Sequence, residues 1–198
     1  MPKLEKTRKN ISHYVTRPIA SALARTPLTP NMVTWLGFCV TVVAAALIAT
    51  EHLFAAGIVV LVAGFFDMLD GALARATKRV TRFGGILDST LDRVSEAILL
   101  LGLLAVFSRG GQTAESLLTG FALLGSLLVS YIRARMEGLG IECQAGLFTR
   151  PERVIVLALG LLLSGFDYAL VIALSVITFF SYFTAGQRLI YAWKQTRK

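Results

Sequence analysis

The chain is 198 residues long and carries a formal net charge of +8 at pH 7. Apolar residues make up 55% of it, charged residues only 16%, and the mean hydropathy is +0.67, which exceeds what a soluble domain normally carries. These values exclude an ordinary soluble protein and predict an integral membrane protein. No nucleic-acid-binding motif accompanies the basic residues, so the positive charge suits anionic lipid headgroups and phosphorylated substrates better than nucleic acid.

The segment before the first long apolar run has basic residues on one helical face and apolar residues on the other. Tyr14, Ile19 and Leu23 recur with other apolar residues at helical spacing. We expect residues 7–25 to form an amphipathic juxtamembrane helix that lies on the cytoplasmic leaflet and bends at Pro18. A helix packed against other protein remains the alternative.

Six stretches of the remaining chain are apolar enough to be candidate membrane crossings, although the fifth is short. The hydrocarbon core of a bilayer is about 30 Å thick and needs roughly 20 helical residues per crossing. The connections between the stretches leave no room for a second soluble domain. We therefore predict an all-α integral membrane protein with a single domain over residues 1–198, whose six-helix bundle covers residues 32–191. The candidate crossings are residues 32–50, 53–74, 84–107, 114–133, 151–166 and 168–191.

Basic residues gather on one side of this predicted topology. Eighteen of the 20 Lys and Arg residues fall before the first crossing, around the connections after the second and fourth crossings, or towards the C-terminus. Arg109 falls in a loop on the opposite side, and Arg93 falls within a crossing. Under the positive-inside rule, this distribution predicts that both termini are cytoplasmic.

Four aspartates interrupt the second and third crossings: Asp67, Asp70, Asp88 and Asp92. A carboxylate in hydrocarbon costs several kcal/mol unless it is compensated, so acidic residues within a membrane indicate a functional site. Four carboxylates at one site would repel one another if no cation lay between them. The sequence therefore predicts a site for hard divalent cations.

The spacing of these aspartates places them together. Asp67 and Asp70 are three residues apart and Asp88 and Asp92 are four apart, so each pair shares one helix face. Both pairs fall no more than about 12 Å below the cytoplasmic surface, at 1.5 Å per helical residue. Two neighbouring antiparallel helices could then turn all four carboxylates into one cavity that opens to the cytoplasm. Oxygen ligands without nearby His or Cys favour Mg²⁺ or Mn²⁺ over Zn²⁺.

Small residues and one arginine surround the aspartates in a way that suits a bound diphosphate. Gly71 and Gly84 allow a ligand to come close to the helix backbone, and Ala74 is small on the same flank. Arg75 is placed to meet a phosphate oxygen. Close helix packing is the other common reason for glycine in membrane helices, and the aspartates make it the weaker explanation here.

The pattern Asp67-x2-Asp70-Gly71-x2-Ala74-Arg75-x8-Gly84-x3-Asp88-x3-Asp92 resembles the complete signature of the CDP-alcohol phosphotransferase family, with all eight fixed positions present. The resemblance covers nearly the whole chain, because the family core is also six transmembrane helices after a juxtamembrane helix. The segment from Thr29 to Thr34 resembles the family's segment opening the first crossing, in which Pro30, Asn31 and Thr34 would help to hold the nucleotide. The same residues also suit a helix start, with Thr29 as N-cap and Pro30 at the first helical position.

The resemblance also implies roles for the aspartates. Asp67, Asp70 and Asp88 would bind the metals and the CDP diphosphate, and Asp92 would complete the metal site. We expect two Mg²⁺ or Mn²⁺ ions. Asp92 is also the family's candidate general base for an acceptor hydroxyl, whose oxygen then attacks the phosphorus bearing the lipid while CMP leaves. Glu96, one turn beyond Asp92, lies outside the signature, and we interpret it as a supporting or structural acid.

Residues outside the signature bear on the acceptor alcohol. Ser89 and Arg93, in the stretch LDSTLDR, resemble the residues found there in phosphatidylinositol-phosphate and archaetidylinositol-phosphate synthases. Residues 130–137 and 150–153 resemble two further basic segments of the same enzymes. Thr149 stands where the second segment often has an acid, which is a departure from that pattern.

Three arginines at the cytoplasmic ends of different helices suit a phosphorylated acceptor. Arg133, Arg153 and Arg188 could donate bidentate, charge-assisted hydrogen bonds to a phosphate. They could instead anchor the protein at the membrane surface or pair with Glu137 and Glu152. The three together favour inositol phosphate as acceptor, with glycerol 3-phosphate, and hence a phosphatidylglycerophosphate synthase, as the alternative.

The sequence leaves several alternatives open. Acidic residues inside a helix bundle could line a pathway for divalent cations or protons, although here the polar residues end at one layer on the cytoplasmic side. The lipid donor could be CDP-diacylglycerol or an ether-linked analogue, because generic apolar surfaces hold either. The resemblance implies a homodimer in the cell membrane, with both termini and the active site on the cytoplasmic side.

Overall fold

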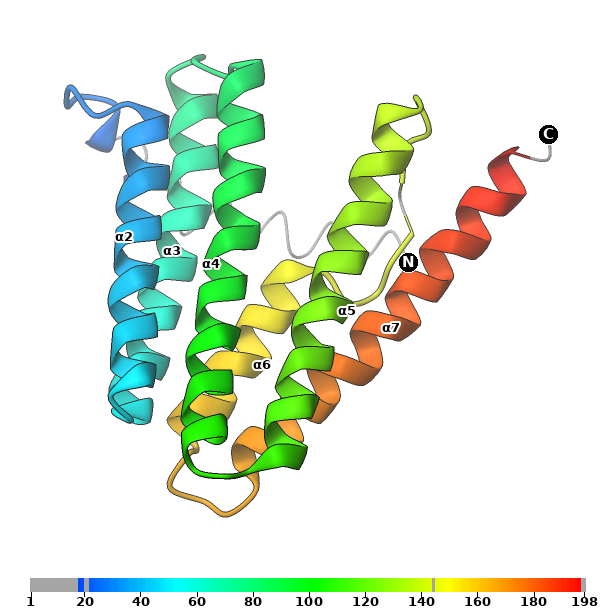
Figure 1. Ribbon diagram of the computed structural model, residues 1–198. Coiled ribbons are helices and arrows are strands. Elements are labelled where there is room, and N and C mark those ends of the chain that lie inside the picture. The colour runs from blue at the N-terminus through cyan, green and yellow to red at the C-terminus, as the bar shows by residue number, and fades with distance from the viewer. Residues whose placement is uncertain (1–17, 20–21, 144, 197–198) are drawn as a thin grey trace.

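The computed structural model describes residues 18–19, 22–143 and 145–196 of the 198-residue chain (Figure 1). Most of the expected juxtamembrane helix over residues 7–25 lies outside the described residues, and only residues 18–19 and 22–23 of it are seen in helical conformation. The elements formed by the described residues are all helices, which confirms the all-α class. These helices are α2 (Pro30–Ala49), α3 (Leu53–Ala76), α4 (Arg82–Arg109), α5 (Thr113–Gly138), α6 (Arg150–Leu162) and α7 (Ala169–Thr196).

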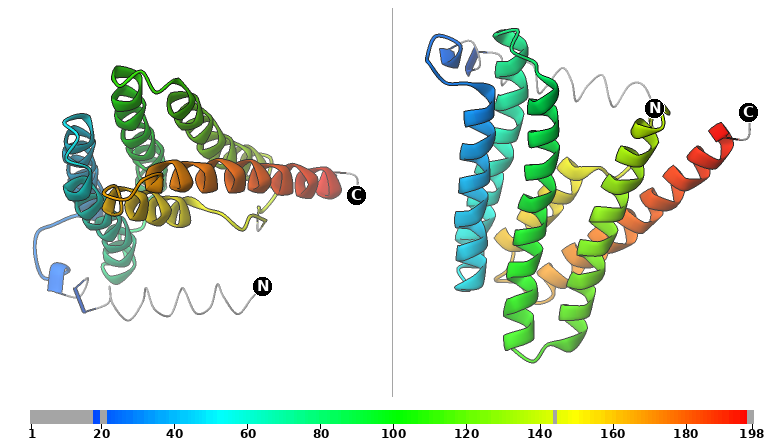
Figure 2. Two further views of the ribbon diagram at one scale, coloured as in Figure 1. Left: turned by 90° about the horizontal axis from the view of Figure 1, so that it is seen from below. Right: turned by 45° about the horizontal axis from the view of Figure 1, so that its top comes forward.

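The helices close into a ring. α2 packs against α3 and α4, α3 also packs against α6, α6 against α7, α7 against α5, and α5 against α4. Figures 1 and 2 show α2, α3 and α4 running side by side, with the short helix α6 between α3 and α7. Because α6 begins part-way along the bundle, its first residues reach the interior of the ring rather than one of its ends.

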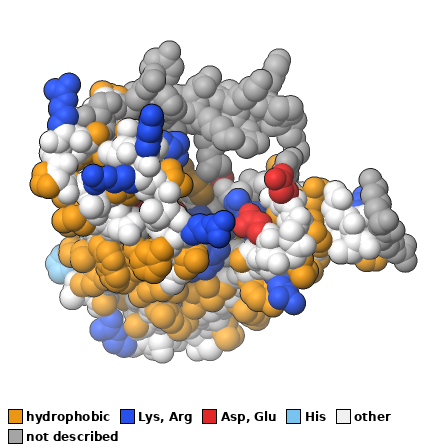
Figure 3. All heavy atoms as spheres, turned by 90° about the horizontal axis from the view of Figure 1, so that it is seen from above, with side chains coloured by type: hydrophobic (Ala, Val, Ile, Leu, Met, Phe, Trp, Pro, Cys, Tyr) orange, Lys and Arg blue, Asp and Glu red, His pale blue; other side chains and the backbone are white. Residues whose placement is uncertain are grey.

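Successive helices run in alternating directions along the bundle. α2 and α4 begin, and α3, α5 and α7 end, at the same end of the bundle, which is at the top of Figure 1. Figure 3 shows Lys and Arg side chains spread over this face among hydrophobic ones. We call it the basic end, and it carries Lys78, Arg79, Arg82, Arg135 and Lys194.

Length and composition qualify four of the described helices as candidate membrane spans, namely α2, α3, α5 and α7. α4 has 28 residues but carries Asp88, Asp92, Arg93 and Glu96 within its first 15 residues. α6 has only 13 residues, which at 1.5 Å per residue span about 20 Å, less than the roughly 30 Å of a bilayer core. It stops at Leu162, before the end expected at residue 166, because residues 163–168 form turns that include Gly165 and the left-handed residue Tyr168.

An apolar cluster fills the half of the ring away from the basic end. Its most buried members include Ile48, Leu103, Leu161 and Leu174, which are completely buried. Two close approaches tighten this half: a Cβ on Gly57 would lie 2.9 Å from Cγ of Leu162, and one on Gly160 would lie 2.5 Å from Cβ of Ala173. Glycine therefore lets α6 contact α3 on one side and α7 on the other.

Threonine residues cap the starts of α2, α4 and α6. Thr29 caps α2 and accepts a hydrogen bond from the Met32 amide, with Pro30 in the first turn, as the sequence predicted. Thr81 caps α4 by accepting from the Gly84 amide at 3.0 Å. Thr149 begins α6 in a capping box with Glu152. Each such cap stabilises its helix by about 1 kcal/mol, so the positions of these helix starts are well defined.

Candidate active site

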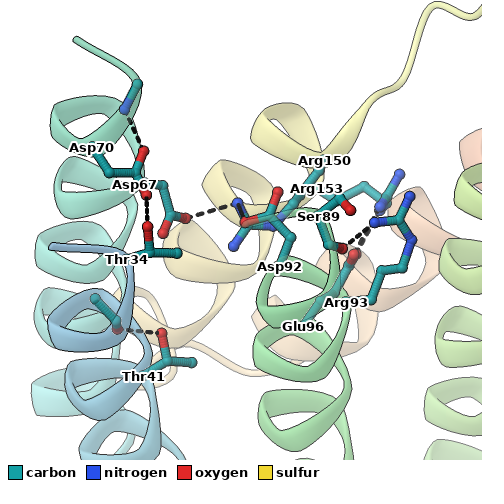
Figure 4. Close-up of polar contacts among 12 residues, drawn as sticks. Thr34, Thr41, Asp67, Asp70, Ser89, Asp92, Arg93, Glu96, Arg150 and Arg153 are labelled. Atoms are coloured by element: carbon teal, nitrogen blue, oxygen red, sulfur yellow. Dashed lines mark hydrogen bonds and ion pairs between the residues drawn. The ribbon is translucent and has the colours of Figure 1, made fainter. Parts of the chain in front are cut away.

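The signature aspartates form two facing walls. Asp67 and Asp70 lie on α3, Asp88 and Asp92 lie on α4, and both helices pack against α2. Figure 4 shows Asp67 and Asp92 directed towards each other across the space between their helices. Asp70 is buried, with 5% of its surface exposed, and the other three are partly buried. The structure thus brings the four predicted residues to one region at a common depth.

The α3 wall is held by α2. The hydroxyl of Thr34 donates a 2.8 Å hydrogen bond to Oδ2 of Asp70, and Thr34 is itself largely buried. A Cβ on Gly37 would lie 3.0 Å from Cβ of Phe66 and 3.4 Å from Oδ1 of Asp67, so α2 and α3 are in close contact beside both carboxylates. Thr34, which the resemblance assigned to the nucleotide, therefore also orients a carboxylate.

Two signature glycines lie beside polar side chains that the resemblance also assigns to the donor. Asn31 lies beside the start of α4, since a Cβ on Gly84 would come within 3.1 Å of its Oδ1. Gly71 faces the side chain of Arg75, whose Nη1 lies 3.4 Å from the position of an added Cβ. Among the described residues, the atoms nearest to Gly71 on this side belong to the flexible end of the Arg75 side chain, so a ligand that moves Arg75 could approach the α3 backbone.

A residue that sequence reasoning did not assign to the site lies between the two walls. Nη1 of Arg150 is 2.7 Å from Oδ2 of Asp67 and 2.7 Å from Oδ1 of Asp92, so one nitrogen bridges α3 and α4 (Figure 4). Arg150 is the first residue of α6, and the early start of that helix inside the ring carries the guanidinium to the carboxylates. The sequence signal for Arg150 is the basic stretch at residues 150–153, whose resemblance points to the acceptor and not to the carboxylates.

The donor atoms of the two walls fit Mg²⁺ or Mn²⁺ in kind. All are carboxylate oxygens, and Asp67 and Asp92 already converge on one cationic group, the Arg150 guanidinium. In their present arrangement, no three His, Cys, Asp or Glu side chains of the described residues are close enough together to hold one ion. Asp67 and Asp92 are the carboxylates that would hold a cation between the walls, and Arg150 now occupies one oxygen of each.

The three arginines proposed for the acceptor differ from one another. Arg153 and Arg188 are buried, with 1% and 3% of their surface exposed. Arg188 donates to the backbone oxygens of Ala145 and Val129, which fastens α7 to the α5–α6 connection and to α5. Arg133 is half-exposed and pairs with Glu137 one turn later at 2.8 Å, as the ion-pair alternative predicted. Arg188 lies within electrostatic range of the other two arginines.

The glutamates near these arginines have separate functions. Glu152, the other partner considered from the sequence, accepts from the backbone and hydroxyl of Thr149 in the α6 cap. Glu96 binds Arg153 through both carboxylate oxygens, at 2.5 and 2.7 Å. This pair is buried on both sides and joins α4 to α6. The sequence identified both residues but did not indicate that they would meet.

Comparison with known proteins identifies the family. The model of the CDP-alcohol phosphatidyltransferase family matches residues 27–185, which include all eight signature positions. The chain belongs to the CDP-alcohol phosphatidyltransferase family. Arg133 and Arg153 lie within the matched residues, and Arg188 lies just beyond them.

Relatives within this family resemble the chain over most of its length. It is 40% identical over 202 residues to the archaetidylinositol phosphate synthase of Methanothermobacter thermautotrophicus, with all of both chains covered. Its fold is similar to that of Mycobacterium tuberculosis phosphatidylinositol phosphate synthase with CDP-DAG bound, with a TM-score of 0.83 and 37% identity over 91% of this chain and 94% of that one. The same mycobacterial enzyme in complex with manganese and citrate gives a TM-score of 0.80 and 38% identity, over 90% and 88% of the two chains.

Proposed function

We propose that this phosphatidyltransferase moves a phosphatidyl group, or its ether-lipid counterpart, from a CDP-activated lipid to a hydroxyl of inositol phosphate and releases CMP. The observation that carries the proposal is that α6 brings Arg150 onto Asp67 and Asp92 and, three residues later, carries the buried Arg153, which lies within electrostatic range of the buried Arg188. This combination offers one subsite for a diphosphate and another for a phosphorylated acceptor. The names of the relatives support inositol phosphate over glycerol 3-phosphate.

The donor end of the site would be formed by α2, α3 and α4. Asp67, Asp70 and Asp88, completed by Asp92, would hold two divalent cations between the walls. When bound, these cations would neutralise the diphosphate and stabilise the departing CMP. The complex of the mycobacterial relative with manganese supports a divalent metal in this family, and we infer Mg²⁺ or Mn²⁺ here.

The nucleotide and its diphosphate would contact residues beside the carboxylates. Pro30, Asn31 and Thr34 begin the helix nearest the α3 wall and would hold the nucleotide. Gly71 and Gly84 would let the diphosphate approach the helix backbones, with the small side chain of Ala74 on the same flank. Arg75, which lies over Gly71, would move onto a phosphate oxygen.

Asp92 would act on the acceptor. Its carboxylate accepts the proton of the acceptor hydroxyl, whose oxygen forms a bond to the lipid-bearing phosphorus as the bond from that phosphorus to CMP breaks. An Asp92 that remains paired with Arg150 is a weaker base, because the positive charge stabilises the unprotonated carboxylate. We therefore infer that Arg150 leaves Asp92 when metal and donor bind.

The acceptor phosphate would be held by Arg153 and Arg188, with Arg133 at the exposed edge of the pocket. Buried guanidinium groups recognise a phosphate strongly and leave an unphosphorylated alcohol poorly matched, since Nη1 of Arg153 would then remain unpaired. This difference favours a phosphorylated acceptor over serine, choline or free inositol.

The transport alternative receives no support from the interior of the ring. Among the described residues, the buried charged side chains are Asp70, Glu96, Arg153 and Arg188, all in or near the proposed site. Beyond them, the apolar cluster fills most of the other half, where a buried hydroxyl such as that of Thr119 carries no charge to attract an ion. We also propose, from the basic end and the family resemblance, a homodimer with its single domain in the cell membrane and its termini and active site facing the cytoplasm.

An acceptor screen tests the proposed function. Purified full-length protein with CDP-diacylglycerol and Mg²⁺ or Mn²⁺ should release CMP with inositol phosphate and should form one phosphatidylinositol phosphate per CMP. An archaeal-type CDP-ether lipid is run in parallel, with Asp70→Asn as the inactive control. Faster CMP release with glycerol 3-phosphate would support the phosphatidyl transfer but reject inositol phosphate as the acceptor. No CMP release with any acceptor would reject the reaction itself.

A further inference from the structure

In the buried pair of Glu96 and Arg153, the glutamate pairs with two of the three guanidinium nitrogens. Oε1 and Oε2 of Glu96 accept from Nε and Nη2 of Arg153 at 2.5 and 2.7 Å. Glu96 is 7% exposed and Arg153 is 1% exposed. One edge of the guanidinium is therefore fixed by a two-point contact, which determines both its position and the direction of its plane.

The opposite corner of the same guanidinium has no protein partner. Nη1 of Arg153 is buried and makes no hydrogen bond to another described residue. A buried N–H group without an acceptor is costly, so such groups are usually satisfied by protein, water or ligand. An anionic oxygen of the acceptor is a fitting partner, because Nη1 is the one guanidinium nitrogen that Glu96 and the backbone leave available.

Glu96 also couples this corner to the proposed base. It follows Asp92 by four residues on α4, so both side chains lie on one helix face, about one turn apart. Arg153 and Arg150 are three residues apart at the start of α6 and meet Glu96 and Asp92, respectively. Two ion pairs thus hold the start of α6 in register with α4. In the proposed function, the Arg150–Asp92 pair lies beside the reacting hydroxyl and the Arg153–Glu96 pair lies beside the acceptor phosphate.

We propose that Glu96 is a positioning residue for acceptor recognition, which holds Arg153 by one edge so that Nη1 faces the acceptor phosphate at a fixed distance from Asp92. The proposal rests on the proposed function, in that the acceptor carries a phosphate. Glu96 itself does not contact the substrate. The negative charge of Glu96 offsets the positive charge of Arg153. Glu96 therefore contributes by orienting the guanidinium and not by increasing the net attraction for phosphate.

Two other functions of Glu96 make different predictions. If the pair only stabilises the fold, removing Glu96 should lower the thermal stability and the apparent kcat in proportion to the folded fraction, and should leave both KM values unchanged. If Glu96 chiefly neutralises Arg153, removing its charge should strengthen phosphate binding and lower the KM for inositol phosphate. A positioning function instead raises this KM, with little change in the KM for the CDP-lipid.

The experiment uses full-length protein in detergent with Glu96→Gln and Glu96→Asp. Gln keeps the shape but loses the charge and one acceptor oxygen, and Asp keeps the charge but withdraws the carboxylate by one methylene. We expect both variants to raise the KM for inositol phosphate about tenfold, with kcat and the CDP-lipid KM within about twofold of wild type. Glu115→Gln, a glutamate at the opposite end of the bundle, is the matched control and should change none of these constants.

A double variant separates positioning from stability. Arg153→Met should raise the acceptor KM and lower the melting temperature, because it leaves the Glu96 carboxylate buried without its partner. Adding Glu96→Gln should restore much of the melting temperature yet raise the acceptor KM no further, since Glu96 acts through Arg153. An acceptor KM in Glu96→Gln that is unchanged or lower than in wild type would overturn the proposal, as would additive effects in the double variant. If the wild type prefers another phosphorylated acceptor, the same set of variants is measured with that acceptor. The acceptor screen then tests the choice of alcohol, and the variants separately test the role of Glu96.

Discussion

Nη1 of Arg150 lies 2.7 Å from Oδ1 of Asp92, the carboxylate proposed as the base, and makes an equally short contact with Asp67 on the opposite wall. A guanidinium at this point provides the positive charge that the facing carboxylates require. Asp67 and Asp92 are also proposed metal ligands. Arg150 and a divalent cation would therefore compete for these carboxylates.

This competition predicts tighter metal binding when Arg150 is removed. Losing a partly buried contact to a charged group is worth about 1–2 kcal/mol, so Arg150→Met should bind Mn²⁺ roughly five- to thirtyfold more tightly in the absence of substrate. Free Mn²⁺, measured by electron paramagnetic resonance during titration of the purified protein, gives the affinity without requiring turnover. Arg109→Met, at the far end of α4, serves as control. Unchanged or weaker Mn²⁺ binding in Arg150→Met would show that the guanidinium supports the site instead of competing for it.

Thr34 offers a test of how the α3 wall is held. Thr34→Val removes the 2.8 Å hydrogen bond to Asp70 at nearly constant volume, and a hydrogen bond to a charged group is worth about 1.5–3 kcal/mol. We expect Mn²⁺ affinity and the CDP-lipid KM to worsen by about tenfold or more in this variant.

The same helix supplies a matched control for that change. Thr41 lies two turns later, is also buried, and donates only to the Gly37 carbonyl of its own helix. Thr41→Val should therefore leave metal and donor binding within about twofold of wild type. Similar losses in both variants would mean that the effect comes from packing of α2 and not from the carboxylate.

Asp92 and Asp70 should differ when each is changed to Asn. Asp70 is a proposed metal and diphosphate ligand, so Asp70→Asn should lose Mn²⁺ affinity, CDP-lipid affinity and turnover together. Asp92→Asn should lose turnover by about a hundredfold or more, because general-base catalysis contributes typically 10²–10⁴, yet keep measurable CDP-lipid binding. Single-turnover rates and equilibrium binding of the CDP-lipid separate the two effects. Equal losses of rate and affinity in Asp92→Asn would make this residue a ligand only.

The sequence predicts the helices of this protein well because their signals are local. Apolar runs locate the helix starts to within two residues, and Thr29 with Pro30 marks the start of α2 in the way the structure confirms. The helix ends are located less well. α5 and α7 continue five residues past their predicted ends, and α6 stops four residues before its predicted end because turn residues follow Leu162. Hydropathy alone does not predict the end of α6, because the residues after Leu162 remain largely apolar.

The site was predictable only where its residues follow one helix. The aspartate pairs are spaced by three and four residues, so helical geometry gives their shared faces directly. The contacts of Arg150 with Asp67 and Asp92, and of Arg153 with Glu96, join helices that are distant in the chain. They depend on α6 starting inside the ring between α3 and α7, which no spacing in the sequence specifies.

The proposed acceptor pocket should respond unequally to loss of its arginines. Arg188 is buried and held by two backbone carbonyls, whereas Arg133 is half-exposed and already paired with Glu137. A surface ion pair is worth only about 0–1 kcal/mol, and a buried charge-assisted contact about 1.5–3 kcal/mol. Arg188→Ala should therefore raise the KM for inositol phosphate roughly ten- to a hundredfold, and Arg133→Ala less than about tenfold.

The measurement for these arginine variants pairs steady-state kinetics at varied inositol phosphate with a CDP-lipid KM, which should stay near wild type. Melting temperature in detergent identifies any general loss of fold in Arg188→Ala, and Arg188→Lys keeps the charge while losing the fork. Wild-type protein should also use inositol phosphate far better than free inositol, because an unphosphorylated acceptor leaves the buried N–H groups unpaired. Equal use of the two acceptors would contradict the phosphate pocket. A larger KM effect for Arg133→Ala than for Arg188→Ala would show that the acceptor phosphate binds at the exposed edge of the ring and not in its interior.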